Sequence, residues 1–283
     1  MSDPLLARLT ASLKDTAGVA AIVLGGSRAR GTATEASDTD LGLYFHRERG
    51  IDTESLRRAI ESVPGARIGT LTEVGEWGPW IVGGAWLSVE GRKVDLLYRP
   101  IEGVAETIAE CRSGRIRMDY QPGHPHGFCS AIWMGEVALC RPLHDPGGEV
   151  ARLKALTDPY PDALRVAVVG RFFCEVLFAI ENAELGAKRA DATHVAGSAY
   201  RALACIGQTL FALNRRYLIN EKGALAEAAG LPLTISDLGE RVAQIWAAIG
   251  RGGLTQACAA LRRMEGELRS LVGSSNPDHD GAS

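Results

Sequence analysis

Apolar residues in the first hundred positions gather in short runs separated by glycine-rich turns, a spacing typical of β-strands. The run at residues 19–24 (VAAIVL) ends in two glycines, as a buried strand would. Runs at residues 85–89 and 92–98 flank Glu90-Gly91, which predicts a β-hairpin with a two-residue turn. Strands are also expected at residues 38–45, 67–72 and 82–89. The pattern therefore predicts a small β-sheet.

Two stretches with helical spacing accompany these strands. A first helix is marked by Leu5, Leu6, Leu9 and Leu13. Residues 53–63 (TESLRRAIESV) predict a second, which Pro64-Gly65 would end. Residues 73–81 read as a loop that carries Trp77 and Trp80. These tryptophans are placed either to stack on a ring of a ligand or to plug an edge of the core, and the second role is the more common one.

From about residue 150 onward the spacing of apolar residues is helical throughout. In residues 165–181, six apolar side chains repeat at helical intervals and predict one broad buried face. Three further stripes follow, in residues 203–217, 238–249 and 254–271. Four or five amphipathic helices with short connections predict an antiparallel bundle.

The fold class that follows is α+β, a small mixed β-sheet with flanking helices followed by an all-α bundle. We divide the chain into a first domain at residues 1–105, a connecting segment at 106–150 and a bundle at 151–272. Residues 273–283 are small and polar, and we expect them to be disordered. The connecting segment contains a loop with His124 and His126, but the spacing of its histidines and cysteines matches no common zinc pattern.

Composition limits the classes of function. The net charge of −3 and the pI near 6.1 argue against a long nucleic acid as substrate, because that partner requires a broad basic surface. No apolar run is long enough to span a membrane, and the first residues do not resemble a secretory signal. The 6 cysteines show no paired spacing. We therefore expect a cytoplasmic protein that acts on a small molecule or on another protein.

The candidate chemistry lies in residues 25–40. Gly25-Gly26-Ser27 forms a tight turn after a predicted strand, and Ser27 is placed to cap the short helix that follows. Thr32 stands where a Walker loop requires lysine, so a phosphate-binding turn here is of another kind. Asp38 and Asp40 are two residues apart, and on a strand they would present their carboxylates on the same side. Such a pair favours a hard cation such as Mg²⁺.

A third carboxylate, Asp95, lies on the second strand of the predicted hairpin, which would carry it back beside the first two. With Gly26-Ser27, Asp38-Thr39-Asp40 and Asp95 in this order, the chain resembles the nucleotidyltransferase superfamily that includes DNA polymerase beta, kanamycin nucleotidyltransferase and the minimal nucleotidyltransferases. The resemblance extends over residues 15 to 100. Segments at 123–128, 140–146 and 214–222 are similar to those of uncharacterised bacterial nucleotidyltransferase-domain proteins with a C-terminal helical domain.

The resemblance implies roles for these residues. Asp38, Asp40 and Asp95 would bind metal, with two Mg²⁺ ions expected, and Asp95 would complete the site or accept the proton of the acceptor hydroxyl. Gly26 and Ser27 would hold the terminal phosphates of the nucleotide. Arg28 is a further nucleotide-binding candidate, although a solvated helix arginine is the more common explanation. Two metals about 4 Å apart can stabilise both the entering and the leaving oxygen of an in-line displacement.

The helical domain contributes weaker candidates. In related transferases a tyrosine and a lysine from this domain reach the nucleotide, which makes Tyr217 and Lys222 the matching positions. Lys222 has an alternative role as a partner of a helix C-terminus. Glu175 is a minor candidate for a general base, because an ion pair with Arg171 four residues earlier accounts for it.

The resemblance implies a Mg²⁺-dependent enzyme that transfers a nucleoside monophosphate from an NTP, expected to be ATP, to a hydroxyl of a small acceptor with release of pyrophosphate. Two alternatives remain open at this point. One is adenylylation of a protein, such as a tyrosine of a partner toxin. The other is a non-catalytic nucleotide-binding protein of the same fold, against which the presence of all three carboxylates argues. The oligomeric state and the identity of the acceptor do not follow from the sequence.

Overall fold

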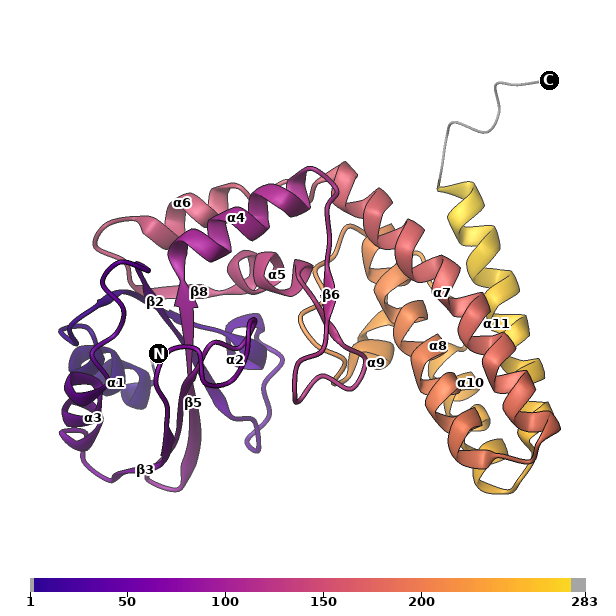
Figure 1. Ribbon diagram of the computed structural model, residues 1–283, viewed down its shortest axis with the longest axis horizontal. Helices are drawn as coiled ribbons and strands as arrows, with labels where there is room; N and C mark the ends of the chain where they lie inside the picture. Colours follow the sequence, from indigo (N-terminus) through magenta and orange to yellow (C-terminus); the bar gives the residue numbers. More distant parts are fainter. Residues whose placement is uncertain (1–2, 276–283) are drawn as a thin grey trace. The chain divides into compact units, whose positions relative to one another are not determined.

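The computed structural model describes residues 3–275, which form two compact units. The first unit contains the described residues up to Cys111 together with Arg117–Pro159. The second contains Arg112–Ile116 and the chain from Tyr160 onward. The first unit is built on a mixed β-sheet and the second is helical (Figure 1). The expected α+β class with a C-terminal helical region is therefore confirmed.

A six-stranded sheet with the strand order β3-β4-β5-β2-β1-β8 is the centre of the first unit. Its strands are β1 (Val19–Leu24), β2 (Thr39–Phe45), β3 (Ala66–Leu71), β4 (Gly84–Val89), β5 (Arg92–Pro100) and β8 (Arg141–His144). Strands β2 and β5 are parallel, whereas the other neighbouring pairs are antiparallel. This one parallel pair makes the sheet mixed, because the chain crosses over between the two strands through α3 (Thr53–Glu61), β3 and β4.

The predicted hairpin of β4 and β5 is present. Its turn residues, Glu90 and Gly91, both have positive φ angles, 52° and 80°. Two consecutive residues of this kind form a turn whose twist matches that of the flanking strands. The hairpin brings Asp95 into the middle of the sheet, where β5 lies between β4 and β2.

One face of the sheet is covered by α1 (Pro4–Leu13) and α3, which lie side by side (Figure 1). Both helices begin at an aspartate whose side chain accepts bonds from backbone amides, Asp3 from Leu5 and Asp52 from Glu54 and Ser55. The leucines that predicted α1 are all buried. They pack with alternate residues of four strands, which include Ile22, Leu24, Leu41, Leu43, Phe45, Ala85, Leu87, Val89, Val94, Leu96 and Tyr98. This face is the hydrophobic core of the unit.

Apart from residues 112–116, the segment after β5 belongs to the first unit, and it is more than the connection that we expected at residues 106–150. It contains α4 (Ile101–Arg112), a small hairpin of β6 (Met118–Asp119) and β7 (Phe128–Cys129), α5 (Ala131–Leu139), β8 and α6 (Glu149–Ala155). Strand β8 pairs with β1, which would otherwise leave an open edge. Lys154 of α6 donates to the carbonyls of Val137 and Cys140 at 3.3 and 2.9 Å at the end of α5. Sheet pairing and capping thus fold this segment onto the sheet of the first unit.

The helical unit contains α7 (Asp162–Lys188), α8 (Ala192–Leu213), α9 (Ala224–Ala228), α10 (Leu238–Gly250) and α11 (Leu254–Ser274). Helices α7 and α8 are joined by a short turn and pack along each other (Figure 1). A small apolar cluster of Ala183, Val195, Leu254 and Cys258 ties α7, α8 and α11 together. Arg262 of α11 adds a bidentate bond to Glu184 of α7, with both distances 2.7 Å.

Two boundaries in this unit differ from the sequence prediction. Helix α8 ends at Leu213, so Tyr217 lies beyond it and does not continue its apolar stripe. Helix α11 continues to Ser274, two residues into the segment that we expected to be a disordered tail, and residues 276–283 of that tail lie outside the described residues. Local apolar spacing does not distinguish a helical residue from one in the following turn. Within residues 3–275 no helix is long and apolar enough to cross a membrane.

The packing of α3 on the sheet provides a stability test. Leu56 is fully buried beneath the strands, whereas Leu156, in the same unit, is 42% exposed. We expect Leu56→Ala to lower the free energy of unfolding by about 2–5 kcal/mol because it leaves a cavity. Leu156→Ala should change it by about 0.5 kcal/mol or less. Urea unfolding of both variants measures the difference, and equal losses would contradict the core described here.

Candidate active site

Alternate residues of β2 and β5 point to the face of the sheet opposite α1 and α3. On this face, which we call the site face, Asp40 of β2 lies directly beside Asp95 of the parallel strand β5. Both residues are half-buried. Their neighbours Leu41 and Leu96 point to the core instead and are buried. Asp95 was predicted to lie beside the aspartate pair, and the pairing of β2 with β5 places it next to Asp40.

The glycine turn after β1 lies at the same level of the sheet. The Gly25 amide donates to the Asp40 carbonyl at 2.8 Å. Gly26 has a φ of 58°, and a β-carbon at this position would lie 1.8 Å from Oδ2 of Asp40. Only glycine satisfies both conditions, because any side chain would be strained and would collide with the carboxylate. The turn therefore packs directly against the Asp40 carboxylate.

Helix α2 (Gly26–Arg30) follows this turn and corrects one prediction. Gly25 occupies the N-cap position, and no side chain caps the helix. Ser27 lies inside the helix, so it does not serve as the expected cap. Its carbonyl accepts the Thr32 amide at 3.0 Å, and its side chain is half-buried beside the turn. An uncapped helix start leaves amides available for an anion.

Asp38 comes directly before β2, two residues ahead of Asp40, and is half-buried. The loop that carries it is held by Arg28, whose Nε donates to the Asp38 carbonyl at 3.0 Å and whose Nη2 donates to the Ser37 carbonyl at 2.6 Å. Arg28 is thus engaged with the loop backbone. Arg28 therefore positions the loop that carries Asp38, and its contact with the nucleotide stays a prediction.

Residues 6–115 match the sequence model of the nucleotidyltransferase domain family. The matched range includes the glycine turn, Asp38, Asp40 and Asp95, so it contains every element of the site described above. This part of the chain is a nucleotidyltransferase domain. The domain lies in the first unit except for residues 112–115, and the match does not include the helices that follow Tyr160.

Similarity over the whole chain is weaker. Among solved structures, the nucleotidyltransferase is similar to a nucleotidyltransferase-like protein from Exiguobacterium sibiricum 255-15, at 11% sequence identity and a TM-score of 0.44. The match covers 94% of this chain and 74% of the other. No curated protein gives a significant match. These comparisons leave the acceptor of the reaction open.

The donor set fits a hard divalent cation, because it consists of carboxylate oxygens and Gly26 leaves room for one of them. Asp38, Asp40 and Asp95 are the residues that would hold such an ion in this nucleotidyltransferase domain. Among residues 3–275 no three His, Cys, Asp or Glu side chains form a ready-made metal cluster. Neighbouring carboxylates repel each other, so a cation is needed to draw them together.

A buried ion pair lies on the site face, four residues after Asp95 on β5. Arg99 is only 3% exposed and makes two bonds of 2.8 and 2.9 Å to the Glu136 carboxylate of α5. Its Nη1 also donates to the Tyr98 carbonyl at 3.0 Å. Burial alone would lower the pKa of Arg99, but the Glu136 carboxylate and, to a lesser extent, Asp40 raise it. Arg99 therefore provides a fixed, buried positive charge that interacts with Asp40.

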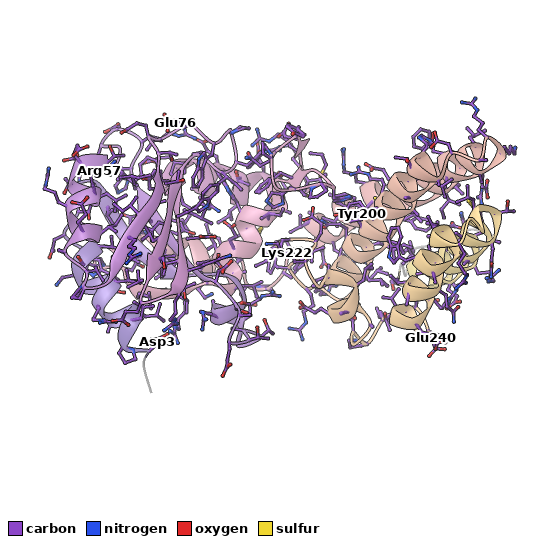
Figure 2. The ribbon with its side chains drawn as sticks, turned by 90° about the horizontal axis from the view of Figure 1, so that it is seen from below. Asp3, Arg57, Glu76, Tyr200, Lys222 and Glu240 are labelled. Carbon is purple, nitrogen blue, oxygen red and sulfur yellow. The ribbon has the colours of Figure 1, made fainter. Side chains whose placement is uncertain are left out.

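The two candidates from the helical unit lie outside regular helices. The Tyr217 ring packs against Tyr160 with centroids 4.7 Å apart. Lys222 lies in the segment before α9, where its amide donates to Asn220 Oδ1 at 2.9 Å and its side chain is exposed (Figure 2). Helix α8 ends at Leu213, so Lys222 is not in the last turn of that helix. Its role at the nucleotide stays a prediction.

Glu175 is bound by two cations of its own unit. Arg171 lies 3.5 Å from Oε1, as expected from their spacing, and Arg201 of α8 donates to Oε2. The second partner was not predicted, because it comes from another helix. These bonds make Glu175 a structural link between α7 and α8.

The loop with His124 and His126 anchors aromatic packing in the first unit. The His124 ring meets Phe128 edge to face with centroids 4.9 Å apart, and His126 is buried. Trp80 is buried too, stacked on Phe128 at 5.1 Å and donating from Nε1 to Asp119 at 2.8 Å. Of the two roles considered for Trp80, the core plug is the one that the structure shows.

Sequence reasoning missed Trp86, which is the cross-strand neighbour of Asp95. It is 53% exposed on the site face and stacks on Trp77 with ring centroids 5.0 Å apart. A tryptophan at an outward position of a half-buried strand was the available signal. It was not recognised because the pairing of β4 with β5 decides what this residue faces.

The close approach of Gly26 to Asp40 predicts a specific loss of nucleotide binding. Gly26→Ala adds the collision described above to the cost of a positive φ. Gly31→Ala is a matched control, because Gly31 has a φ of 73° and nothing within 4 Å of its added β-carbon. Both variants should lose about 1–2 kcal/mol of stability from strain. Only Gly26→Ala should also abolish the rise in Tm on addition of NTP with Mg²⁺; retention of that rise in Gly26→Ala would contradict the assignment.

The burial of the Arg99–Glu136 pair predicts a difference in stability between two glutamate variants. Glu136→Ala leaves a buried guanidinium without its partner and should cost about 3–5 kcal/mol of unfolding free energy. Glu106→Ala removes an equally bidentate bond to Arg47, but both of these side chains are more than half exposed. That change should cost less than about 1 kcal/mol. Chemical denaturation compares the two variants, and a cost below about 1 kcal/mol for Glu136→Ala would show that Arg99 is solvated.

Proposed function

We propose that the protein transfers a nucleoside monophosphate from an NTP, with ATP as the expected donor, to a hydroxyl of a small-molecule acceptor with release of pyrophosphate. The observation that supports this reaction best is the alignment of three elements at one level of the sheet. The Gly25-Gly26 turn, Asp40 and Asp95 follow one another across β1, β2 and β5. This is the order in which a triphosphate tail, its α-phosphate and an acceptor would lie.

The residues of the turn would bind the terminal phosphates. Amides at the start of α2 point a positive partial charge at an anion, and Ser27 lies next to them. Bound Mg²⁺, for which two ions are proposed, would neutralise charge on the phosphates and polarise the entering hydroxyl. Asp38, Asp40 and Asp95 would hold these ions, and Asp95 is also placed to accept the proton of the hydroxyl. Catalysis would then consist mainly of positioning and charge neutralisation.

The helical unit is proposed to shape the acceptor site and to add Tyr217 and Lys222 to the nucleotide. An ammonium group on an exposed, flexible side chain suits contact with phosphate. We place the activity in the cytoplasm, because none of the six cysteines is in a disulfide and reducing conditions would keep them so. Neither a membrane nor a long nucleic acid is proposed as a partner, given the acidic net charge of −3.

The test begins with the four NTPs, each with and without Mg²⁺. We expect ATP with Mg²⁺ to raise the Tm of the protein and EDTA to cancel the rise. Labelled ATP is then offered with a panel of small hydroxyl compounds and with cell lysate. Asp40→Asn and Asp95→Asn should each lower transfer by about 100-fold or more, because each removes a carboxylate that would hold the metal ions.

Asp15→Asn is the matched control for these variants, since Asp15 is exposed in the segment between α1 and β1. It should transfer label as the wild type does. Wild-type transfer in Asp40→Asn and Asp95→Asn would refute the proposed site. Label in a protein band with none in any small compound would replace the small acceptor by a protein.

A further inference from the structure

The site face continues past Asp95 onto β4, where an aromatic surface begins. Trp86 lies beside Asp95 in the antiparallel pairing of β4 and β5. Gly25, Asp40, Asp95 and Trp86 are thus linked by successive pairings across four neighbouring strands. Each step across a sheet is about 4.8 Å, so Trp86 lies roughly 14 Å from the phosphate turn and next to the third carboxylate.

The aromatic surface is preorganised for a ligand. One side of the Trp86 ring stacks on Trp77, with an interplanar angle of 28°. The Trp77 ring also lies against Gly84, where a β-carbon would come within 3.0 Å of its Cζ3 atom. Half of Trp86 remains exposed, in contrast to Trp80, which is 4% exposed. We call Trp77 and Trp86 the tryptophan platform.

A buried glutamine fixes the loop that carries Trp77. Gln121 is 2% exposed, and its Nε2 donates to the Trp77 carbonyl at 2.8 Å. Its Oε1 accepts the amides of Trp80 and Ile81, both at 3.4 Å. The Trp133 indole donates to the Trp80 carbonyl at 3.1 Å. These bonds hold the loop in one conformation, so the platform loses little conformational freedom when a ligand binds.

The geometry of the reaction decides which substrate meets the platform. In an in-line displacement the entering hydroxyl and the leaving pyrophosphate lie on opposite sides of the phosphorus. If the pyrophosphate is at the Gly26 turn and the phosphorus is at Asp40 and Asp95, the hydroxyl enters from the side of β4. The substrate that lies over Trp86 is then the acceptor.

We propose that the tryptophan platform binds the acceptor of this nucleotidyltransferase through a flat aromatic or heteroaromatic ring that carries the reacting hydroxyl directly or through one carbon. The proposal rests on the function proposed above. Cross-strand neighbours have β-carbons about 5 Å apart, so a ring stacked on Trp86 places a hydroxyl at this short tether beside Asp95. Stacking on an indole favours a flat π-system over a saturated ring of the same size. Neither Trp86 nor Trp77 is replaceable by an aliphatic residue in this role.

The first experiment measures binding of a ring without nucleotide. The full-length protein is labelled with 5-fluorotryptophan, and its 5 tryptophans are assigned by single Trp→Phe variants. Benzyl alcohol is the probe, and cyclohexylmethanol is its saturated control of similar size. We expect benzyl alcohol to shift the Trp86 and Trp77 signals saturably, with an affinity about fivefold to tenfold higher than that of cyclohexylmethanol. Trp246, which is 37% exposed in the helical unit, is the internal control and should not shift.

Three results would overturn the proposal. The first is an unmoved Trp86 signal, and the second is an equal shift at Trp246. The third is equal or tighter binding of cyclohexylmethanol, which would mark a general apolar patch. Because this measurement contains no NTP, its outcome is independent of whether the protein transfers nucleotides.

The second experiment identifies the substrate on the platform. ATP with Mg²⁺ is compared with inorganic tripolyphosphate with Mg²⁺. If the Trp86 signal shifts with ATP and Mg²⁺ but not with tripolyphosphate and Mg²⁺, the platform binds the nucleobase, and the acceptor assignment is overturned. With an aromatic acceptor that the enzyme uses, Trp86→Ala should raise the KM for the acceptor by at least about tenfold and leave the KM for ATP unchanged. Trp86→Phe should retain most of the wild-type affinity for the acceptor, and Trp246→Ala should change neither KM. An unchanged KM for the acceptor in Trp86→Ala would refute the platform.

Discussion

Asp40 and Asp95 are neighbours on parallel strands, and the packing of the first unit keeps these two like charges side by side. Asp40 and Asp95 are level in the β2–β5 register. The opposite face of the same strands imposes that register, since Leu41, Leu43, Leu96 and Tyr98 are buried in one core. A slip of one residue would bring these apolar side chains into water and the aspartates into the core. The hydrophobic effect on one face thus holds the charges together on the other.

The elements around the carboxylates also help to hold them in place. Gly26 removes the β-carbon that would displace the Asp40 carboxylate, and Arg28 ties down the loop that carries Asp38. Arg99 places a buried positive charge on the same face, held by Glu136 of α5. The segment with α5 and β8 is therefore part of the machinery that positions the site. A site of this kind needs a scaffold that is rigid before the substrate binds, because reorganisation during the reaction raises the barrier.

The two halves of the proposed reaction rest on different parts of the site face. The donor half uses backbone amides and oxygen ligands at β1 and β2, which recognise phosphate in any nucleotide. The acceptor half lies toward β4, where Trp77 and Trp86 offer an aromatic surface beside Asp95. Polar contacts fix the position of a reacting group, whereas the shape and apolar character of the adjoining surface select among substrates. The helical unit has its own ion pairs and core, as in the links of Glu175 to Arg201 and of Glu184 to Arg262.

Patterns of residues that are close together in the sequence were sufficient to predict several features of the protein. The glycine turn, the spacing of Asp38 and Asp40, the hairpin turn at Glu90-Gly91 and the change to helical spacing near residue 150 all depend on residues close together in sequence. Backbone propensity and side-chain periodicity act at that range. The α+β class, the superfamily and the hairpin that carries Asp95 were therefore accessible from the sequence alone.

Tertiary structure decided what depends on residues far apart in the chain. Ser27 does not cap its helix, Arg28 binds the loop ten residues away, and Glu175 gains Arg201 from a second helix. Strand β8 joins the sheet at β1, more than a hundred residues earlier in the chain. Trp86 faces the site only because β4 pairs with β5 in one register. Long-range pairing is set by the burial of the whole core, which no local pattern encodes, and it determined which side chains surround the carboxylates.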